Sequence, residues 1–415
     1  MQNPLLSVLK IPSFLFLLIS EFFSQFAMNL LNFVLLLVAF DLSKSNMAVA
    51  GVVLSFTVPS IVFGILAGVY VDKWNKKNVL VYTNLLRALA AFPLIFVSHE
   101  LFLVYLFSFL ISLITQFFIP AETPIIPLLV EKKLLLSANA LFSMGIFGSM
   151  IVAYALSGPL LLLFGKVNVF IFITILFAVS GFFAFLIKLK KPEPHVNADL
   201  KIFEELRDAF SLMAKKENIY HSLFLLTLLQ TLILIIAVIG PGYATNILHI
   251  QVEKFPVLFV TPAVIGMSFG AFLIGNFWHK RSKQQLAKIG LLVIGIVMIL
   301  FPYLNNFIFI ANNLLSNISL FSNVTEVHIL LIFAVVIGFA FSLVFVPSNT
   351  LIQEETTDRQ RGKIYGSLNT LVGVISIIPI LGVGFLADYI GVGQVITIIG
   401  IIVVAIAALR FFKFK

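Results

Sequence analysis

The sequence is divided into apolar blocks of about 20 residues or more, the length that crosses a ~30 Å hydrocarbon layer as a helix. Only helices and closed β-barrels satisfy their backbone hydrogen bonds in lipid, and barrel strands alternate polar and apolar residues. The blocks show no such alternation. They therefore predict membrane-spanning α-helices.

About twelve spans are predicted in this way. The apolar blocks lie near residues 11–40, 47–71, 79–98, 101–130, 137–164, 168–189, 219–248, 257–278, 286–310, 328–352, 364–387 and 393–412. With 60% hydrophobic and 11% charged residues, the chain is far more apolar than an ordinary soluble domain. We expect an all-α, multi-pass protein whose main surroundings are the lipid bilayer.

Most of the 27 Lys and Arg residues fall on one side of this arrangement. The inner segments carry clusters such as 73–77 and 188–216, whereas the outer loops keep only Lys44, Lys166 and Lys254. The positive-inside rule then places both termini in the cytoplasm, with the chain in a plasma or inner membrane. This topology accounts for the net charge of +9, and we expect no nucleic-acid partner.

The longest polar stretch, at 188–218, divides the predicted spans six and six. Apolar residues recur in it at helical spacing opposite charged ones, which favours a helix on the membrane surface. We predict an N-terminal six-helix bundle at 1–190, a cytoplasmic linker with an amphipathic helix at 191–218, and a C-terminal six-helix bundle at 219–415.

Two pairs of similar segments indicate that the bundles are related by duplication. GVYVDKWNKK (68–77) follows the second span and GNFWHKRSKQ (275–284) the eighth, while IPAETPII (119–126) and VPSNTLIQ (346–353) end the fourth and tenth. One insertion, the outer loop at 311–327, reconciles the spacing of both pairs. Internal repeats of this kind predict two pseudo-symmetric halves.

The segment 68–77 resembles the loop signature of the major facilitator superfamily, Gly-x-Leu-x-Asp-Arg-x-Gly-Arg-Lys. The Gly, the Asp and the trailing cations match, whereas Tyr70 replaces the Leu and Asn75 the second Gly. Asn tolerates left-handed backbone almost as Gly does, so we expect the turn to survive. The resemblance implies a latch in which Asp72 pairs with cations of the other bundle; a plain positive-inside loop is the alternative. The implied cytoplasmic gate comprises Gly68, Asp72, Lys73, Lys76, Lys77, Arg87, Arg359 and Arg361.

The fifth span resembles the antiporter signature of exporters in the same superfamily. Gly145, Gly158 and Pro159 fall at its spacing, but Tyr154 and the Leu162-Leu163 pair stand where it prefers Gly. The alternative is that small residues let helices pack closely and that the proline bends the helix.

Longer segments resemble the branch that holds the drug and macrolide efflux proteins and the enterobactin exporter. They are NLLRAL (84–89), FFIPAETPIIPLLV (117–130), SANAL (137–141), SGPLLLL (157–163), DRQRGKIYGSLNTL (358–371) and GVGFLAD (382–388). Together they extend over nearly the whole chain. The resemblance implies the twelve-helix major facilitator fold.

Polar groups inside spans are costly in lipid and are therefore candidates for function. Glu21, Gln25, Asn29 and Asn32 fall within an arc of roughly 80° on one face of the first span. Glu21 is the only carboxylate well inside that span, and in a low dielectric it can carry a proton at working pH. The alternative is a structural acid hydrogen-bonded to a neighbouring helix.

Two further charges lie within predicted spans. Glu122 stands between Pro120 and Pro124, where a bent helix frees backbone groups, although a charge at a helix end is an alternative. Arg87 is about nine residues into the third span, some 12 Å deep at 1.5 Å per residue. It can snorkel inward, or pair with Asp72 or Glu122.

Polar faces also occur on spans seven, ten and eleven, where they suit a central cavity but can also simply join helices. The predicted proton and substrate cavity comprises Glu21, Gln25, Asn29, Asn32, Glu122, Gln230, Asn349, Tyr365 and Asn369.

The sequence contains no phosphate-binding Gly-x-x-x-x-Gly-Lys-Ser/Thr loop and no metal-ligand motif among its six His. We therefore expect no enzyme activity, no cofactor and no metal. We predict a monomeric, proton-coupled exporter of hydrophobic or amphipathic small molecules that works by alternating access. The alternatives are a siderophore or lysolipid exporter, and a non-transporting membrane receptor or scaffold on the same fold.

Overall fold

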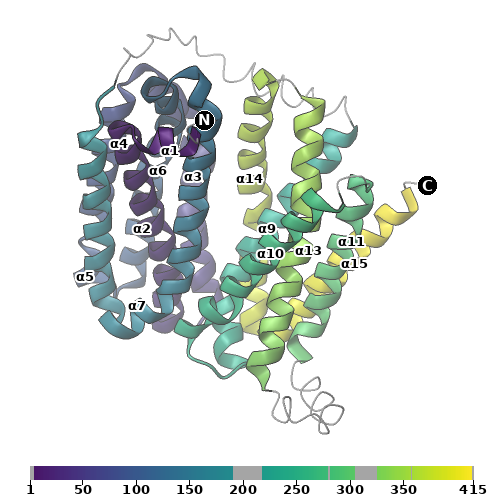
Figure 1. Cartoon of the computed structure of the whole chain (residues 1–415). Helices are drawn as coiled ribbons and strands as arrows, with labels where there is room; N and C mark the ends of the chain where they lie inside the picture. The colour runs from purple at the N-terminus through teal and green to yellow at the C-terminus, as the bar shows by residue number, and fades with distance from the viewer. Residues whose placement is uncertain (1–3, 190–216, 279–280, 304–324, 357, 414–415) are drawn as a thin grey trace, which may run out of the picture. The chain divides into compact units, whose positions relative to one another are not determined.

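The computed structural model describes residues 4–189, 217–278, 281–303, 325–356 and 358–413, and these form helices joined by short connections (Figure 1). The linker helix predicted within 191–218 falls almost wholly outside these ranges. The insertion at 311–327 does so as well, apart from its last residues.

Eleven helices in the described part of the chain are long and apolar enough to cross a membrane. One of them, α7 (Leu135–Leu186), has 52 residues and bends at Gly165, where φ is 74°. Glycine adopts this left-handed conformation at little cost. The bend separates the predicted spans at 137–164 and 168–189, so α7 supplies both. The prediction of an all-α membrane protein with about twelve spans is thus confirmed.

The chain packs as two compact units. Unit 1 contains the described residues of Met1–Ser43 and Gly51–Ile202. Its elements are α1 (Pro4–Leu9), α2 (Pro12–Ser43), most of α3 (Asn46–Lys73), α4 (Lys76–Ala91), α5 (Leu94–Val97), α6 (Leu101–Leu129), η1 (Lys132–Leu134) and α7. α2 lies along α7, and both contribute buried apolar side chains to the interior.

The turn before α4 differs from the prediction. Asn75 has φ −67° and ψ 112°, so its backbone is extended rather than left-handed. Its side-chain oxygen accepts a hydrogen bond from the backbone N–H of Asn78 at 2.9 Å. Asn75 therefore serves as the N-cap of α4, a position at which Asn is strongly preferred.

Unit 2 contains Lys44–Ala50, which begins α3, and the described part of Phe203–Lys415. Its other elements are α9 (Glu217–Asn246), η2 (Val252–Lys254), η3 (Pro256–Val260), α10 (Thr261–Asn276), α11 (Lys283–Leu300), η4 (Phe301–Tyr303), α13 (Glu326–Glu355), α14 (Asp358–Ile390) and α15 (Val392–Lys413). α10 and α13 meet at glycines: a Cβ atom on Gly338 would lie 1.7 Å from the Ala263 carbonyl oxygen. Such contacts let helix backbones approach closely in lipid.

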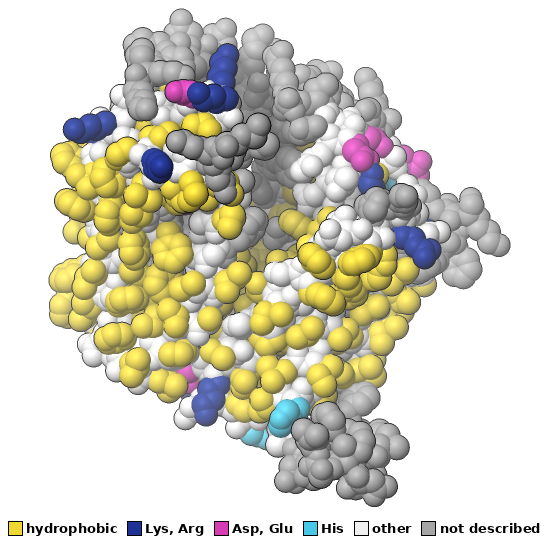
Figure 2. Space-filling view, viewed as in Figure 1, with side chains coloured by type: hydrophobic (Ala, Val, Ile, Leu, Met, Phe, Trp, Pro, Cys, Tyr) yellow, Lys and Arg dark blue, Asp and Glu magenta, His cyan; other side chains and the backbone are white. Residues whose placement is uncertain are grey.

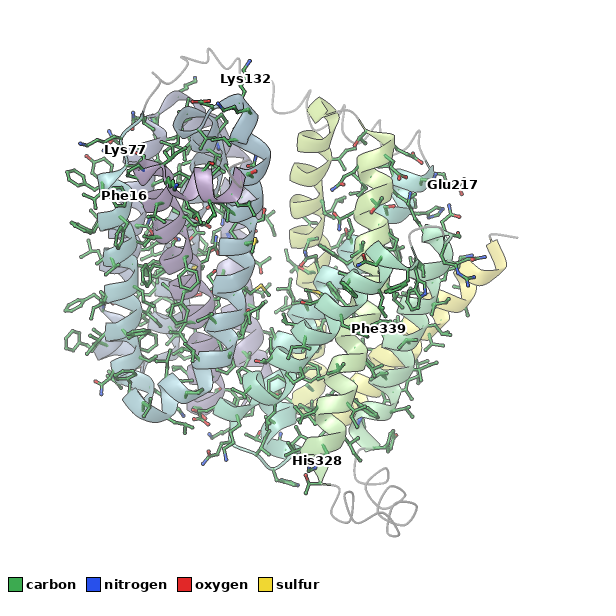
Figure 3. The ribbon with its side chains drawn as sticks, viewed as in Figure 1. Phe16, Lys77, Lys132, Glu217, His328 and Phe339 are labelled. Carbon is green, nitrogen blue, oxygen red and sulfur yellow. The ribbon has the colours of Figure 1, made fainter. Side chains whose placement is uncertain are left out.

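Charged and apolar side chains are segregated along each unit. In the view of Figure 2, hydrophobic side chains cover the middle of each unit, and Lys, Arg, Asp, Glu and His lie towards its ends. Lys77 and Lys132 lie near the same end of unit 1, whereas Glu217 and His328 lie at opposite ends of unit 2 (Figure 3). An apolar band between polar ends is the surface that a bilayer requires.

Candidate functional site

Two carboxyl groups meet in the interior of unit 1. Glu21 lies on α2 and Glu122 on α6, and their exposed fractions are 1% and 7%. The two carboxyl groups are close enough to interact with each other, and Glu122 Oε2 has no hydrogen-bond partner among the described residues. Two negative charges this close in the interior would repel each other, so the arrangement favours a proton on one of the two groups.

The pair continues into a polar chain along α2. Gln25 donates from Nε2 to Glu21 Oε1 at 2.8 Å, and Asn29 donates from Nδ2 to the Gln25 carbonyl oxygen, also at 2.8 Å. Each step is four residues, the spacing that puts side chains on one helix face. Gln25, Asn29 and Asn32 are half-buried. The polar face predicted on this helix is thus present, with Glu21 at its most buried point.

Arg87 places a positive charge in the same interior. It lies on α4, is 1% exposed, and donates from Nη2 to Ser24 Oγ at 3.0 Å and to Asn84 Oδ1 at 2.7 Å. Its guanidinium carbon lies 4.1 Å from the ring centroid of Phe118 and 5.0 Å from that of Phe177. Hydrogen bonds and two aromatic faces therefore hold the guanidinium in place.

The charge of Arg87 acts on both carboxyl groups. One shared proton leaves the pair with a charge of −1, which balances the +1 of Arg87. A buried charge without compensation is strongly unfavourable. With one proton on the two carboxyl groups the cluster would be neutral, and loss of that proton or binding of a second one would change its net charge.

Sequence reasoning found the three charged residues but missed the groups that position Arg87. Asn84 stands three residues before Arg87 on one helix, a spacing that signals contact. Ser24, Phe118 and Phe177 come from three other helical segments, and only the packing of unit 1 brings them to the guanidinium. The sequence predicts Arg87 in the cytoplasmic gate, whereas its side chain is buried in unit 1, where its charge interacts with Glu21 and Glu122.

The rest of the predicted gate is described only in part. Gly68 has open space around the position of a Cβ atom, Lys73 is exposed and Lys77 is half-buried. Lys76 is 7% exposed. The side chains of Asp72, Arg359 and Arg361 fall outside the described residues, so the latch stays a prediction.

The three antiporter-like positions all lie on α7. A Cβ atom on Gly145 would lie 2.8 Å from Leu18 Cδ1 of α2, while Gly158 is buried and Pro159 is exposed. Gly145 thus allows α7 and α2 to pack closely. A role in antiport stays a prediction.

The polar positions predicted for the second bundle lie in unit 2. Gln230 on α9 and Asn349 on α13 are half-buried, and Asn349 Nδ2 donates to the Phe345 carbonyl oxygen at 2.9 Å. The side chains of Tyr365 and Asn369 are not among those described. Within the described ranges, no group of three or more His, Asp or Glu could hold a metal ion.

Comparisons with known proteins identify the family. Residues 17–378 match the family model of the Major Facilitator Superfamily. The chain is 26% identical over 386 residues to the MFS-type transporter YfiS of Bacillus subtilis (strain 168), covering 90% of this chain and 86% of that one. It is 21% identical over 364 residues to macrolide efflux protein A of Streptococcus pyogenes, covering 84% of this chain and 83% of that protein.

Solved structures show the same fold. The nucleoside transporter NupG has a TM-score of 0.72 at 15% identity, covering 97% of this chain and 100% of its own. An inward-facing bacterial homologue of the human lysosomal transporter Spinster has a TM-score of 0.70 at 14% identity, covering 100% of this chain and 97% of its own. The match over most of the chain places this multi-pass membrane protein in the major facilitator superfamily of transporters.

Proposed function

We propose that this transporter exports hydrophobic or amphipathic small molecules in exchange for protons, and that Glu21 and Glu122 together form the proton site. The observation that supports the proposal is the pair of buried carboxyl groups inside unit 1, with the buried guanidinium of Arg87 held in the same interior. In this account the pair binds one proton on one side of the membrane and releases it on the other. Glu21 is the residue that couples proton movement to substrate movement.

The charge balance of Glu21, Glu122 and Arg87 couples proton release to substrate binding in this proposal. With one proton the cluster is neutral and tolerates a dry interior, whereas without it a net negative charge remains. The deprotonated cluster is therefore favoured when water or a substrate reaches it. Gln25, Asn29 and Asn32 on α2 are the groups of unit 1 that we propose contact the substrate.

The direction and the substrate class rest on different observations. The similarity to macrolide efflux protein A supports the proposal that this chain exports its substrate and that the substrate is amphipathic. The 45 Phe and the scarcity of charge favour lipophilic substrates over sugar phosphates or nucleotides. We further propose that the protein acts as a monomer in the plasma membrane with both termini in the cytoplasm, as the Lys and Arg distribution indicates.

Transport by purified protein in proteoliposomes tests the proposal. A pH gradient is imposed, and uptake of a macrolide, an amphipathic dye or a lysolipid is followed together with lumenal pH. We expect uptake of at least one compound to require the gradient and to move protons the other way. Glu21→Gln is expected to reduce gradient-driven uptake at least tenfold while substrate still binds.

Glu100→Gln is the matched control, because Glu100 is exposed at the start of α6 and lies outside the carboxyl pair. It should transport like the wild type. Full coupling in Glu21→Gln would exclude Glu21 as the coupling residue. Substrate binding without movement under any gradient would instead favour a receptor on this fold.

A further inference from the structure

Arg87 is buried near two carboxyl groups, yet its hydrogen bonds go to neutral oxygens. The guanidinium donates to Asn84 Oδ1 at 2.7 Å, to Ser24 Oγ at 3.0 Å and to the Thr83 carbonyl oxygen at 3.4 Å. Glu122 Oε2, on which the charge of Arg87 acts, has no hydrogen-bond partner among the described residues. Neutral groups therefore hold the positive charge while a nearby carboxyl oxygen stays unpaired.

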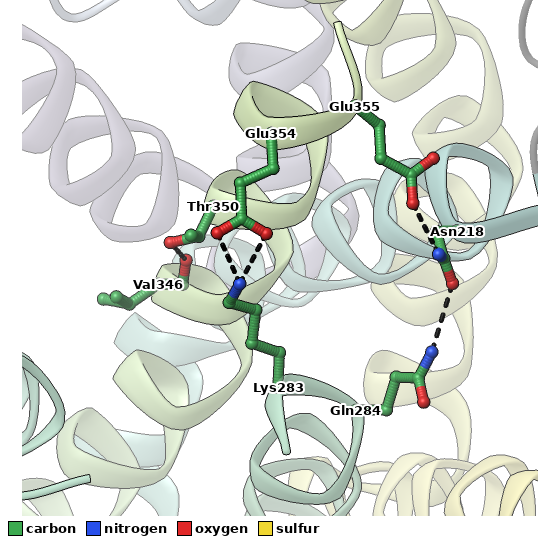
Figure 4. Close-up of polar contacts among 7 residues, drawn as sticks. All are labelled: Asn218, Lys283, Gln284, Val346, Thr350, Glu354 and Glu355. Atoms are coloured by element: carbon green, nitrogen blue, oxygen red, sulfur yellow. Dashed lines mark hydrogen bonds and ion pairs between the residues drawn. The ribbon is translucent and has the colours of Figure 1, made fainter. Parts of the chain in front are cut away.

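Two other cations in the described part of the chain contact carboxylates directly. Lys283 Nζ lies 2.6 and 2.5 Å from the two oxygens of Glu354 (Figure 4). In unit 1, Lys166 pairs with Asp41. Direct contact of this kind favours the ionised carboxylate, so the acid rebinds its proton only at low pH. A carboxyl group that has to rebind a proton near neutral pH therefore needs its cation at a distance.

Asn84 is fixed in the orientation that accepts a hydrogen bond from Arg87. Its Nδ2 donates to the Leu80 carbonyl oxygen at 2.9 Å, one turn earlier in α4, so its Oδ1 is the atom that faces the guanidinium. The side chain is fully buried, and a Cβ atom on Gly181 of α7 would lie 3.4 Å from the Cβ atom of Asn84. Packing and two hydrogen bonds therefore fix the acceptor for Arg87.

We propose that Asn84 is a positioning residue for the proton site, because it holds Arg87 and so prevents a direct ion pair between the guanidinium and Glu122. This inference rests on the proposed role of Glu21 and Glu122 in proton binding. Arg87 then compensates the charge of the two carboxyl groups through space, while a proton can still return to them. Arg87 supplies the charge, and Asn84 sets its position.

Few other charges can act on this part of unit 1. The charged residues of the packed helices α2, α4, α6 and α7, apart from Glu21, Arg87 and Glu122, are Asp41, Lys76, Lys77 and Lys166. Asp41 and Lys166 pair with each other, and the two remaining lysines stand in the first turn of α4. The tyrosines of these helices are neutral near neutral pH. The position of Arg87 is therefore the variable that a change at Asn84 alters.

Two substitutions of Asn84 are expected to act in opposite directions. Asn84→Leu removes the acceptor and frees the guanidinium to contact Glu122, so the pair should lose its proton at a pH about one unit lower. Asn84→Asp supplies a carboxylate that pairs with Arg87 and adds a negative charge, so the pair should keep its proton to a pH about one unit higher. A merely structural role of Asn84 would not produce shifts of opposite sign.

An infrared pH titration of the purified full-length protein measures these shifts through the C=O band of protonated carboxyl groups. Glu21→Gln and Glu122→Gln identify the band of the pair. Ser112→Ala is the matched structural control, because Ser112 is buried in the same unit and its Oγ donates to the Phe56 carbonyl oxygen at 2.7 Å. Its titration midpoint should equal that of the wild type, whatever its stability.

The possible outcomes separate this inference from the proposed function. A wild-type band that neither Glu21→Gln nor Glu122→Gln removes would contradict the proton site, and the role of Asn84 would fall with it. A band of the pair with the same midpoint in wild type and both Asn84 variants, or with shifts of equal sign, would overturn the role of Asn84 alone. If Asn84→Leu does not fold, the similarly sized Asn84→Asp decides: an upward shift supports the proposal, and an unchanged or lower midpoint overturns it.

Discussion

Arg87 shows how one side chain can be fixed deep in a membrane protein. It is fully buried, and its guanidinium combines hydrogen bonds to Ser24 and Asn84 with contacts to the faces of Phe118 and Phe177. A planar guanidinium can make these contacts together, whereas the compact ammonium of Lys cannot. The position of the positive charge beside the carboxyl pair therefore depends on Arg.

Arg87→Met is expected to destabilise the protein by about 3–5 kcal/mol, because it removes the charge that compensates the carboxyl pair. Arg87→Lys keeps the charge but loses the planar contacts, so its effect should be smaller. Thermal unfolding in detergent measures both. Lys132→Met, at an exposed lysine of the same unit, should leave the unfolding temperature unchanged. Equal stability of Arg87→Met and wild type would contradict this account of the cluster.

The sequence predicted which residues of α2 share a face, but it did not predict the carboxyl pair. Helical periodicity relates Glu21, Gln25 and Asn29 because they lie on one helix. The contact between Glu21 and Glu122 depends on which helices are neighbours and how far each is turned about its axis. No pattern within a single span carries that information.

The start of α3 is held by a carboxylate from α14. Asp388 accepts hydrogen bonds from the backbone N–H groups of Asn46 at 2.7 Å and Met47 at 3.1 Å, and from Ser45 Oγ at 2.5 Å. A carboxylate at a helix N-terminus accepts hydrogen bonds from unpaired N–H groups, and its negative charge interacts favourably with the positive end of the helix dipole. A Cβ atom on Gly384 would lie 3.0 Å from that of Ala50, so the two segments pack closely.

Asp388→Ala removes this cap. We expect a loss of roughly 1–2 kcal/mol of stability and faster hydrogen exchange at the first amides of α3. Hydrogen exchange followed by mass spectrometry measures the second effect. Tyr389→Phe, at a neighbouring side chain that is 80% exposed, serves as the control. Unchanged exchange at residues 46–48 in Asp388→Ala would show that the cap does not stabilise the helix.

The helices α10 and α13 cross closely at Gly338. Gly338→Ala would place a methyl group against the Ala263 carbonyl oxygen, and overpacking of this kind costs about 1–3 kcal/mol or more. Gly382→Ala in α14 meets open space, so it should be neutral or slightly stabilising. The two variants carry the same chemical change. Equal unfolding temperatures would show that the close crossing is absent in solution.

The existence of the spans was predictable because the lipid-length apolar blocks leave few alternatives. The residues at which the helices end or bend were less predictable from the sequence. Gly165 bends α7 without a polar loop, and nothing in the apolar run marks which glycine adopts a positive φ. The cap of α3 by Asp388 was also missed, because the residues that meet there are separated by most of the chain.

The distribution of Lys and Arg along the chain predicts which ends of the spans face the cytoplasm. The sequence has no Cys, so single cysteines can be introduced without a background. Lys132→Cys should react with a membrane-impermeant maleimide only after cells are permeabilised, because it lies at the end predicted to be cytoplasmic. Glu100→Cys should react in intact cells. The reverse pattern would contradict the predicted orientation.

The number of protons released when substrate binds shows whether Glu21 and Glu122 form the proton site. Purified protein in weakly buffered detergent solution is mixed with a transported compound, and a pH indicator counts the protons released per substrate bound. We predict release of about one proton from the wild type, and at most a tenth of that from Glu21→Gln and from Glu122→Gln, while both variants still bind. An equal release from wild type and variants would show that the carboxyl pair is not the proton site.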